Sequence, residues 1–123
     1  MEFNVQYRDG FFEVEILGET EPEKYRDVFE TLVAHGKWQP GTSCLVNQTE
    51  LNSKHLTTDE TRDIAEFSAE YSVKLGKSKC ALLFSRDLEY GLGRMWQTFV
   101  ENEWEVSVMV FKSRDEALAW LTG

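Results

Sequence analysis

The chain contains 123 residues, of which 41% are hydrophobic, and its formal net charge is −9. This length and composition predict one folded domain, residues 1–123, with a core of its own, and they disfavour a disordered chain. The acidic charge disfavours nucleic acid and anionic membrane surfaces as partners, because both repel negative charge and the sequence has no run of Lys or Arg.

The N-terminal segment alternates polar and apolar residues from Met1 to Arg8. A signal peptide would instead begin with positive charge and continue with an uninterrupted apolar stretch. No apolar run approaches the roughly 20 residues that a membrane-spanning helix needs. We therefore expect a cytoplasmic protein without a membrane span.

Two segments of alternating character, residues 3–8 and residues 11–17, flank the pair Asp9-Gly10. An Asp-Gly pair between such segments is a strong signal for a two-residue hairpin turn. In the second segment, Glu13 and Glu15 alternate with apolar residues. We expect an antiparallel hairpin with one solvated face.

Four later segments place apolar residues three and four positions apart, which is the spacing of a helix with one buried face. Gly36 and Gly76 end the first two, and Ser85-Arg86-Asp87 opens the third. The other three helices are preceded by Ser or Thr with Glu three residues later, the spacing of a capping box: Thr20 with Glu23, Thr57 with Glu60, and Ser113 with Glu116.

Short apolar runs between these helices predict strands at residues 44–46, 80–84 and 106–111. The middle run is continuously apolar, as in central strands of parallel sheets that are buried on both faces. Cys44 and Cys80 lie in the first two runs. We expect both to be buried, reduced thiols, since a disulfide requires that the two strands be neighbours with fitting geometry.

The resulting order is β-β-α-β-α-β-α-β-α. Alternating strands and helices predict an α/β fold with a largely parallel sheet and right-handed crossovers. The N-terminal hairpin adds an antiparallel pair, so the sheet is expected to be mixed. The order of the strands within the sheet does not follow from the sequence.

Open α/β sheets gather ligands beyond the carboxyl ends of their parallel strands. At those ends the sequence has Asn47, Ser85 and Arg86, and the helices that follow present amino termini suited to an anionic group. We regard these residues as a candidate site for a ligand or partner. The alternative is that Thr57, Ser85 and Ser113 do no more than cap their helices.

The third helix is unusual because it contains Gly91 and Gly93, each of which costs about 1 kcal/mol relative to alanine inside a helix. Either this helix approaches another part of the chain closely, or a ligand or partner lies against the glycines. Tyr90 and Arg94 share a polar stripe of the same helix. They belong either to such a site or to a solvated face.

No established catalytic motif is present, and His35 and His55 have no His or Cys at the spacing of metal ligands. We therefore expect no enzymatic activity, no metal and no cofactor. Met95 and Trp96, if exposed on the third helix, would provide an interface for a homodimer.

Several segments, taken in order, resemble the SpoIIAA-like, or STAS/SEC14-type, proteins of bacteria. These segments are Leu45-Val46-Asn47, Thr57-Thr58-Asp59-Glu60, Tyr90-Gly91-Leu92-Gly93-Arg94-Met95 and residues 110–121. The resemblance covers nearly the whole chain. It implies a STAS-like fold, in which helices pack mainly on one side of a mixed sheet.

The same resemblance implies a non-catalytic regulatory or protein-interaction module, like the STAS domains that antagonise anti-sigma factors. Those domains carry a phosphorylated serine after an aspartate at the start of the second helix. Here that region is Thr57-Thr58-Asp59, so Thr57 and Thr58 become the candidate phosphosites.

The relation to SEC14-type proteins implies a second function class, a carrier of lipid or another small molecule. Its pocket is expected between the third helix and the sheet. The residues expected to line it are Tyr90, Leu92, Met95 and Phe99.

Overall fold

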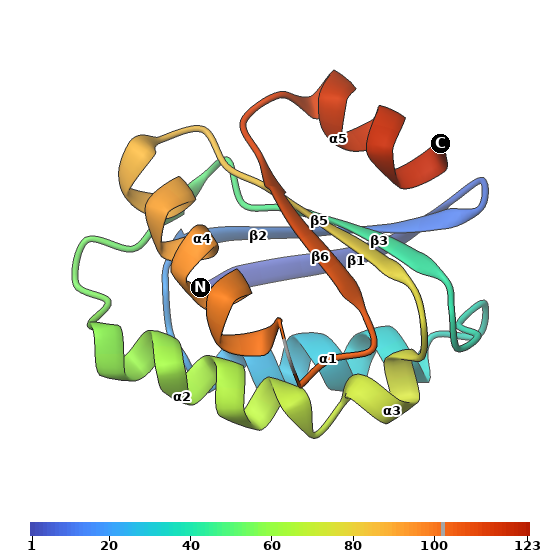
Figure 1. Ribbon diagram of the computed structural model, residues 1–123, viewed down its shortest axis with the longest axis horizontal. Helices are drawn as coiled ribbons and strands as arrows, with labels where there is room; N and C mark the ends of the chain where they lie inside the picture. Colours follow the sequence, from blue (N-terminus) through green and yellow to red (C-terminus); the bar gives the residue numbers. More distant parts are fainter. Residues whose placement is uncertain (102) are drawn as a thin grey trace.

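The computed structural model describes residues 1–101 and 103–123 (Figure 1). The strands formed by these residues are β1 (Glu2–Arg8), β2 (Phe11–Glu19), β3 (Ser43–Asn47), β4 (Leu51–Asn52), β5 (Lys79–Leu83) and β6 (Ser107–Phe111). The helices are α1 (Lys24–Ala34), α2 (Thr58–Ala69), α3 (Ser72–Leu75), α4 (Asp87–Val100) and α5 (Arg114–Thr122).

The sheet has the order β1-β2-β3-β5-β6, and β4 pairs with the end of β2. Strands β1 and β2 are antiparallel and are joined by the turn at Asp9 and Gly10, both of which have positive φ. Every other pair along the sheet is parallel. The prediction of an α/β fold, with a mixed sheet that begins with an antiparallel hairpin, is therefore confirmed.

Helices cover the two faces of the sheet unequally (Figure 1). Alternate residues of β2, such as Phe12 and Ile16, enter the main core together with α1, α2, α3 and α4. On the opposite face, Leu45 packs against Ala117 and Leu121 of α5. Figure 1 shows α5 alone on that side. As expected, the helices therefore pack mainly on one face of the sheet, and α5 covers the other face.

Two of the predicted caps are present. Thr57 Oγ1 accepts a hydrogen bond from the Glu60 N–H, and the Glu60 carboxylate accepts one from the Thr57 N–H, both at 3.0 Å. At the start of α5, Ser113 Oγ accepts from the Glu116 N–H at 3.3 Å. In the part of the chain that the structure describes, no helix is long and apolar enough to cross a bilayer.

The capping box predicted at Thr20 is wrong. Helix α1 begins at Lys24 after Glu23, without a side-chain cap. Thr20 Oγ1 lies 2.6 Å from Ser53 Oγ and 3.2 Å from the carbonyl oxygen of Asn52, which also accepts the Thr20 N–H. These long-range bonds extend the pairing of β2 with β4, and they outcompete the local cap that the spacing suggested.

The helix predicted from Thr57 to Gly76 is divided into α2 and α3 at Tyr71. The Tyr71 ring stacks on Phe29 of α1, with 4.9 Å between ring centroids, and its hydroxyl donates to Glu30 at 2.6 Å. Packing against α1 therefore accompanies the bend, and residues 72–75 continue only as a single turn.

Cys44 and Cys80 are direct neighbours across β3 and β5, and both are free thiols. Burial raises the pKa of the Cys44 thiol well above its ordinary value, and burial raises that of Cys80 to about 12. Both sulfurs therefore stay protonated near neutral pH, as expected for small core side chains.

The buried carboxylate of Glu13 predicts a specific dependence of stability on pH. Two hydrogen bonds from Arg114, at 2.5 and 3.0 Å, are the main reason that the Glu13 pKa lies below its ordinary value. Ionised Glu13 therefore stabilises the fold fully at pH values above its pKa in the unfolded chain, about 4.3. This stabilisation is lost as the pH falls through the lower pKa that Glu13 has in the folded protein.

We expect Arg114→Met, which keeps the apolar stem, to be less stable than wild type at pH 7. The difference should shrink as the pH falls below about 4.3, and it should vanish only below the lowered pKa that Glu13 has in the folded wild type. Urea unfolding at pH 7 and pH 3 measures it. An equal difference at both values would contradict this account of the ion pair.

Candidate functional site

A cavity of about 110 Å³ lies between the sheet and the helices α1, α2 and α4. Its sheet side is formed by alternate residues of β2, β3 and β5, and its helix side by the apolar faces of the three helices. Apolar lining residues include Val14, Ile16, Val28, Ile64, Leu82 and Leu92.

Small side chains at the centre of the sheet explain why this space is left open. Strands β3 and β5 present Cys44, Val46 and Cys80 toward the helices, and all three line the cavity. On the helix side, Gly93 also lines the cavity, although the Phe84 ring already fills the place that a side chain of Gly93 would take. Because protein interiors are normally packed to the density of organic crystals, an open space of this size is a feature to explain.

Three buried side-chain donors in the cavity wall have no hydrogen-bond partner among the described residues. They are the hydroxyl of Ser68 on α2, the indole N–H of Trp96 on α4, and the indole N–H of Trp104. Ser68 is fully buried and Trp104 is 9% exposed. A buried donor without a partner costs about 1–3 kcal/mol, so these groups are suited to a molecule that supplies an acceptor.

Other polar groups in the wall are already paired. The Tyr25 hydroxyl donates to Gln48 Oε1 at 2.7 Å, and burial raises the pKa of this phenol, so it remains neutral. Thr61 Oγ1 donates to the Thr57 carbonyl oxygen at 3.0 Å. The hydroxyl groups of Tyr25 and Thr61 are therefore already satisfied as donors within the protein.

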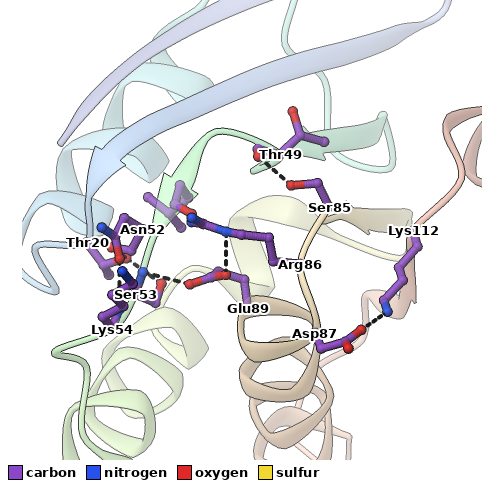
Figure 2. Close-up of polar contacts among 11 residues, drawn as sticks. Thr20, Thr49, Asn52, Ser53, Lys54, Ser85, Arg86, Asp87, Glu89 and Lys112 are labelled. Carbon is purple, nitrogen blue, oxygen red and sulfur yellow. Dashed lines mark hydrogen bonds and ion pairs between the residues drawn. The ribbon is translucent and has the colours of Figure 1, made fainter.

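Glu89, in the first turn of α4, fastens the segment after β4 (Figure 2). Its side chain is 2% exposed, and Oε2 accepts the buried Ser53 N–H at 2.9 Å. Oε1 lies 3.0 Å from Arg86 Nε, in an ion pair without hydrogen-bond geometry. Arg86 also donates to the Leu51 carbonyl oxygen. We call Ser53, Arg86 and Glu89 the clasp. Two of its members, Ser53 and Glu89, line the cavity.

The candidate residues at the strand ends all make internal contacts. Asn47 Oδ1 accepts from the N–H and the hydroxyl of Thr49, at 3.1 and 2.8 Å. Ser85 Oγ donates to the Thr49 carbonyl oxygen at 2.6 Å, and Arg86 belongs to the clasp (Figure 2). Asn47, Ser85 and Arg86 therefore join the ends of β3 and β5 to the segment around β4.

The remaining candidates lie outside the cavity, as one pair at the start of α2 and another on α4. Thr57 and Thr58 are both exposed at the start of α2, where Thr57 serves as the cap. On α4, the exposed Arg94 lies 3.5 Å from the Tyr90 hydroxyl, and the ammonium group of Lys112 lies 5.2 Å from the centre of the Tyr90 ring. None of these four candidates lines the cavity that the described residues form.

Of the residues expected to line a pocket beside the third helix, Leu92 does so, whereas Tyr90, Met95 and Phe99 do not. Trp96 packs inward, with its ring centroid 5.2 Å from that of Trp104. It therefore does not form the exposed patch on which the homodimer hypothesis depended.

Sequence reasoning missed Ser68, Glu89 and Trp104 as site residues. A signal for Ser68 exists, because this serine stands within the apolar stripe of α2 among residues such as Ile64. Glu89 and Trp104 carry no such signal, since their burial depends on segments that are distant in the sequence. Among the described residues, no group of three His, Cys, Asp or Glu side chains could hold a metal ion.

No protein-family model matches the chain, and no curated protein sequence is significantly similar to it. One solved structure that is similar is that of an uncharacterised protein of the DUF3478 family with a SpoIIAA-like fold, from Shewanella loihica PV-4. The match has a TM-score of 0.61 and 19% sequence identity, and it covers 98% of this chain and 92% of the other. The chain has a SpoIIAA-like fold. The fold implied by the sequence resemblance is thereby confirmed.

Proposed function

We propose that this SpoIIAA-like protein binds and carries a small, mainly apolar molecule in the cavity between the sheet and helices α1, α2 and α4. The observation that carries the proposal is the presence of unpartnered donors in an otherwise apolar wall: Ser68, Trp96 and Trp104. Ligand sites combine an apolar lining with a few convergent polar groups in this way.

The size of the cavity limits the ligand. A dry apolar cavity of about 150 Å³ accommodates benzene, so a cavity of about 110 Å³ holds a molecule of at most about six non-hydrogen atoms without rearrangement. A longer apolar chain would require the segment after β4 to open. Glu89 holds that segment through Ser53.

Water is the competing occupant, because buried polar groups with room beside them often bind it. Binding of a small apolar compound in the cavity distinguishes a ligand site from a site that holds only water. We choose methylenecyclopentane, which has six carbon atoms and no hydrogen-bond acceptor, and cyclopentanone, which has the same shape and a carbonyl oxygen.

Two substitutions at Ser68 separate binding in the cavity from binding elsewhere. Ser68→Ala removes the unpartnered hydroxyl and keeps the space, whereas Ser68→Leu fills the space. We expect each variant to be more stable than wild type by about 1 kcal/mol, because a buried unsatisfied group is lost.

Both compounds should raise the melting temperature of wild type and of Ser68→Ala in proportion to the logarithm of their concentration. Neither should do so for Ser68→Leu. Equal effects on all three proteins would indicate binding outside the cavity, and no effect on wild type would contradict the carrier proposal.

Two unpaired cysteines support a cytoplasmic location for this carrier, which we also propose. Cys44 and Cys80 lie side by side in neighbouring strands and remain free thiols. Reducing compartments keep thiols in this state.

A regulatory role through a protein partner is a second candidate function, supported by the exposure of Thr57 and Thr58. A phosphate on either would add about −1.5 to −2 charges at the amino terminus of α2, beside Asp59 and Glu60. On Thr57 it would also replace the hydroxyl that accepts the Glu60 N–H.

Phosphopeptide mass spectrometry of the protein from its native cells tests this role. Phosphate on Thr57 or Thr58 would support it. Unmodified threonines in every growth phase, together with identical partner sets for Thr58→Ala and Thr58→Glu, would contradict it.

A further inference from the structure

We propose that the ligand is a neutral carbonyl compound whose oxygen accepts hydrogen bonds from the indole N–H groups of Trp96 and Trp104. This inference rests on the proposed carrier function and specifies which chemistry the cavity selects. It follows from the balance of donors and acceptors in the wall, from the charge there, and from the size of the space.

The free groups in the cavity wall are mainly donors. The two indole nitrogens can only donate, and the Ser68 hydroxyl can donate or accept. The one unbonded acceptor, Glu89 Oε1, already faces Arg86 Nε at 3.0 Å. A ligand that offers an acceptor atom therefore satisfies groups that otherwise remain unpaired, whereas a ligand that offers only donors does not.

The two indoles are adjacent, which favours one acceptor atom with two lone pairs. Trp96 and Trp104 form an edge-to-face pair with 5.2 Å between centroids and 82° between the ring planes. A carbonyl oxygen has two lone pairs in one plane and can accept from both N–H groups. An ether or tertiary amine offers a more crowded acceptor.

The charge of the wall selects a neutral molecule. Glu89 is the sole charged side chain among the described residues that line the cavity, and the clasp already neutralises it. An anion would be removed from water without a cation to pair with, which costs far more than a hydrogen bond returns. A cation would find the only carboxylate already occupied by Arg86 and Ser53.

Nuclear magnetic resonance of the four indole N–H groups tests the inference on the wild-type protein. Trp38 and Trp120 do not line the cavity, and Trp120 belongs to α5 behind the sheet, so both serve as internal controls. Cyclopentanone should move the Trp96 and Trp104 indole protons downfield and give nuclear Overhauser effects to them. Trp38 and Trp120 should not respond.

Methylenecyclopentane should give the same nuclear Overhauser effects without the downfield shift, because it occupies the space but has no acceptor. Trp96→Phe and Trp104→Phe should each weaken cyclopentanone binding by about three- to tenfold relative to methylenecyclopentane, the range expected for one hydrogen bond. Using both variants covers the case in which one fails to fold.

The outcomes separate the two proposals. If methylenecyclopentane binds and cyclopentanone leaves the indole protons unmoved, the carbonyl inference is wrong and the carrier function stands. If neither compound reaches Trp96 or Trp104, both are wrong. A downfield shift of Trp38 or Trp120 alone would also overturn the inference, because binding would then lie outside the cavity.

Discussion

Glu89→Ala is expected to lower the free energy of unfolding by about 2–4 kcal/mol, a large effect for one acid in the first turn of a helix. The Glu89 side chain is 2% exposed and accepts the buried N–H of Ser53 at 2.9 Å. Its removal leaves that N–H without a partner, deletes buried methylene groups, and releases Arg86 from its ion pair. Urea unfolding monitored by circular dichroism measures the change.

Asp87→Ala provides a matched control in the same turn of α4. Asp87 pairs with Lys112, but its side chain is 93% exposed, and exposed ion pairs contribute little. We expect a much smaller loss of stability than for Glu89→Ala. Similar losses for the two variants would contradict the assignment of Glu89 as the residue that fastens the segment after β4 to α4.

The two glycines of α4 are expected to respond to alanine with opposite signs. A methyl group at Gly91 would meet nothing within 4 Å, so Gly91→Ala should raise the free energy of unfolding by about 0.5–1 kcal/mol through helix propensity. A methyl group at Gly93 would lie 2.5 Å from Cε2 of Phe84. Gly93→Ala should therefore lower stability by about 1–2 kcal/mol, because overpacking exceeds the propensity gain.

The Phe84 ring has little freedom to move aside. Phe84 is 4% exposed and packs with Leu82 and Val110 in the core. Thermal and urea unfolding of the two variants measure the difference between them. If both substitutions changed the free energy of unfolding in the same direction, close packing against Phe84 would not be the reason for glycine at position 93.

The features predicted correctly depend on residues that are close in the sequence. Alternating apolar residues and the Asp9-Gly10 pair specify the hairpin, and Thr57 with Glu60 specifies a cap within a single turn. Such patterns act through neighbouring backbone groups, so a sequence is sufficient to find them. The order of the predicted strands and helices follows from these local signals, although it omits β4 and the division between α2 and α3.

The features that were missed depend on residues brought together from distant segments. Thr20 binds Asn52 and Ser53 instead of capping α1. Close packing of the Phe84 ring requires glycine at position 93, although nine positions separate the two residues in the chain. Nothing in a local window shows that a better partner exists elsewhere. The same reason applies to β4, whose pairing with β2 is itself long-range.

The cavity depends most strongly on distant segments of the chain, because it is the space that side chains from many elements leave unfilled. Its wall combines residues of four strands and four helices, including Leu51 of β4 and Leu75 of α3, with Trp104, which lies between α4 and β6. Ser68 within the apolar stripe of α2, and Gly93 within α4, are the signs of it that the sequence contains. The volume and the unpartnered donors emerge only when all of these elements are packed together.

The most direct test of the cavity as a ligand site is a titration of the ¹⁵N-labelled protein with methylenecyclopentane, followed by amide chemical shifts. We predict saturable changes centred on residues whose side chains line the cavity, such as Ile64 and Leu82, with Ala117 and Leu121 behind the sheet unaffected. The Ser68→Leu variant should show no saturable change. Non-saturable shifts, or the same shifts in Ser68→Leu, would contradict the account.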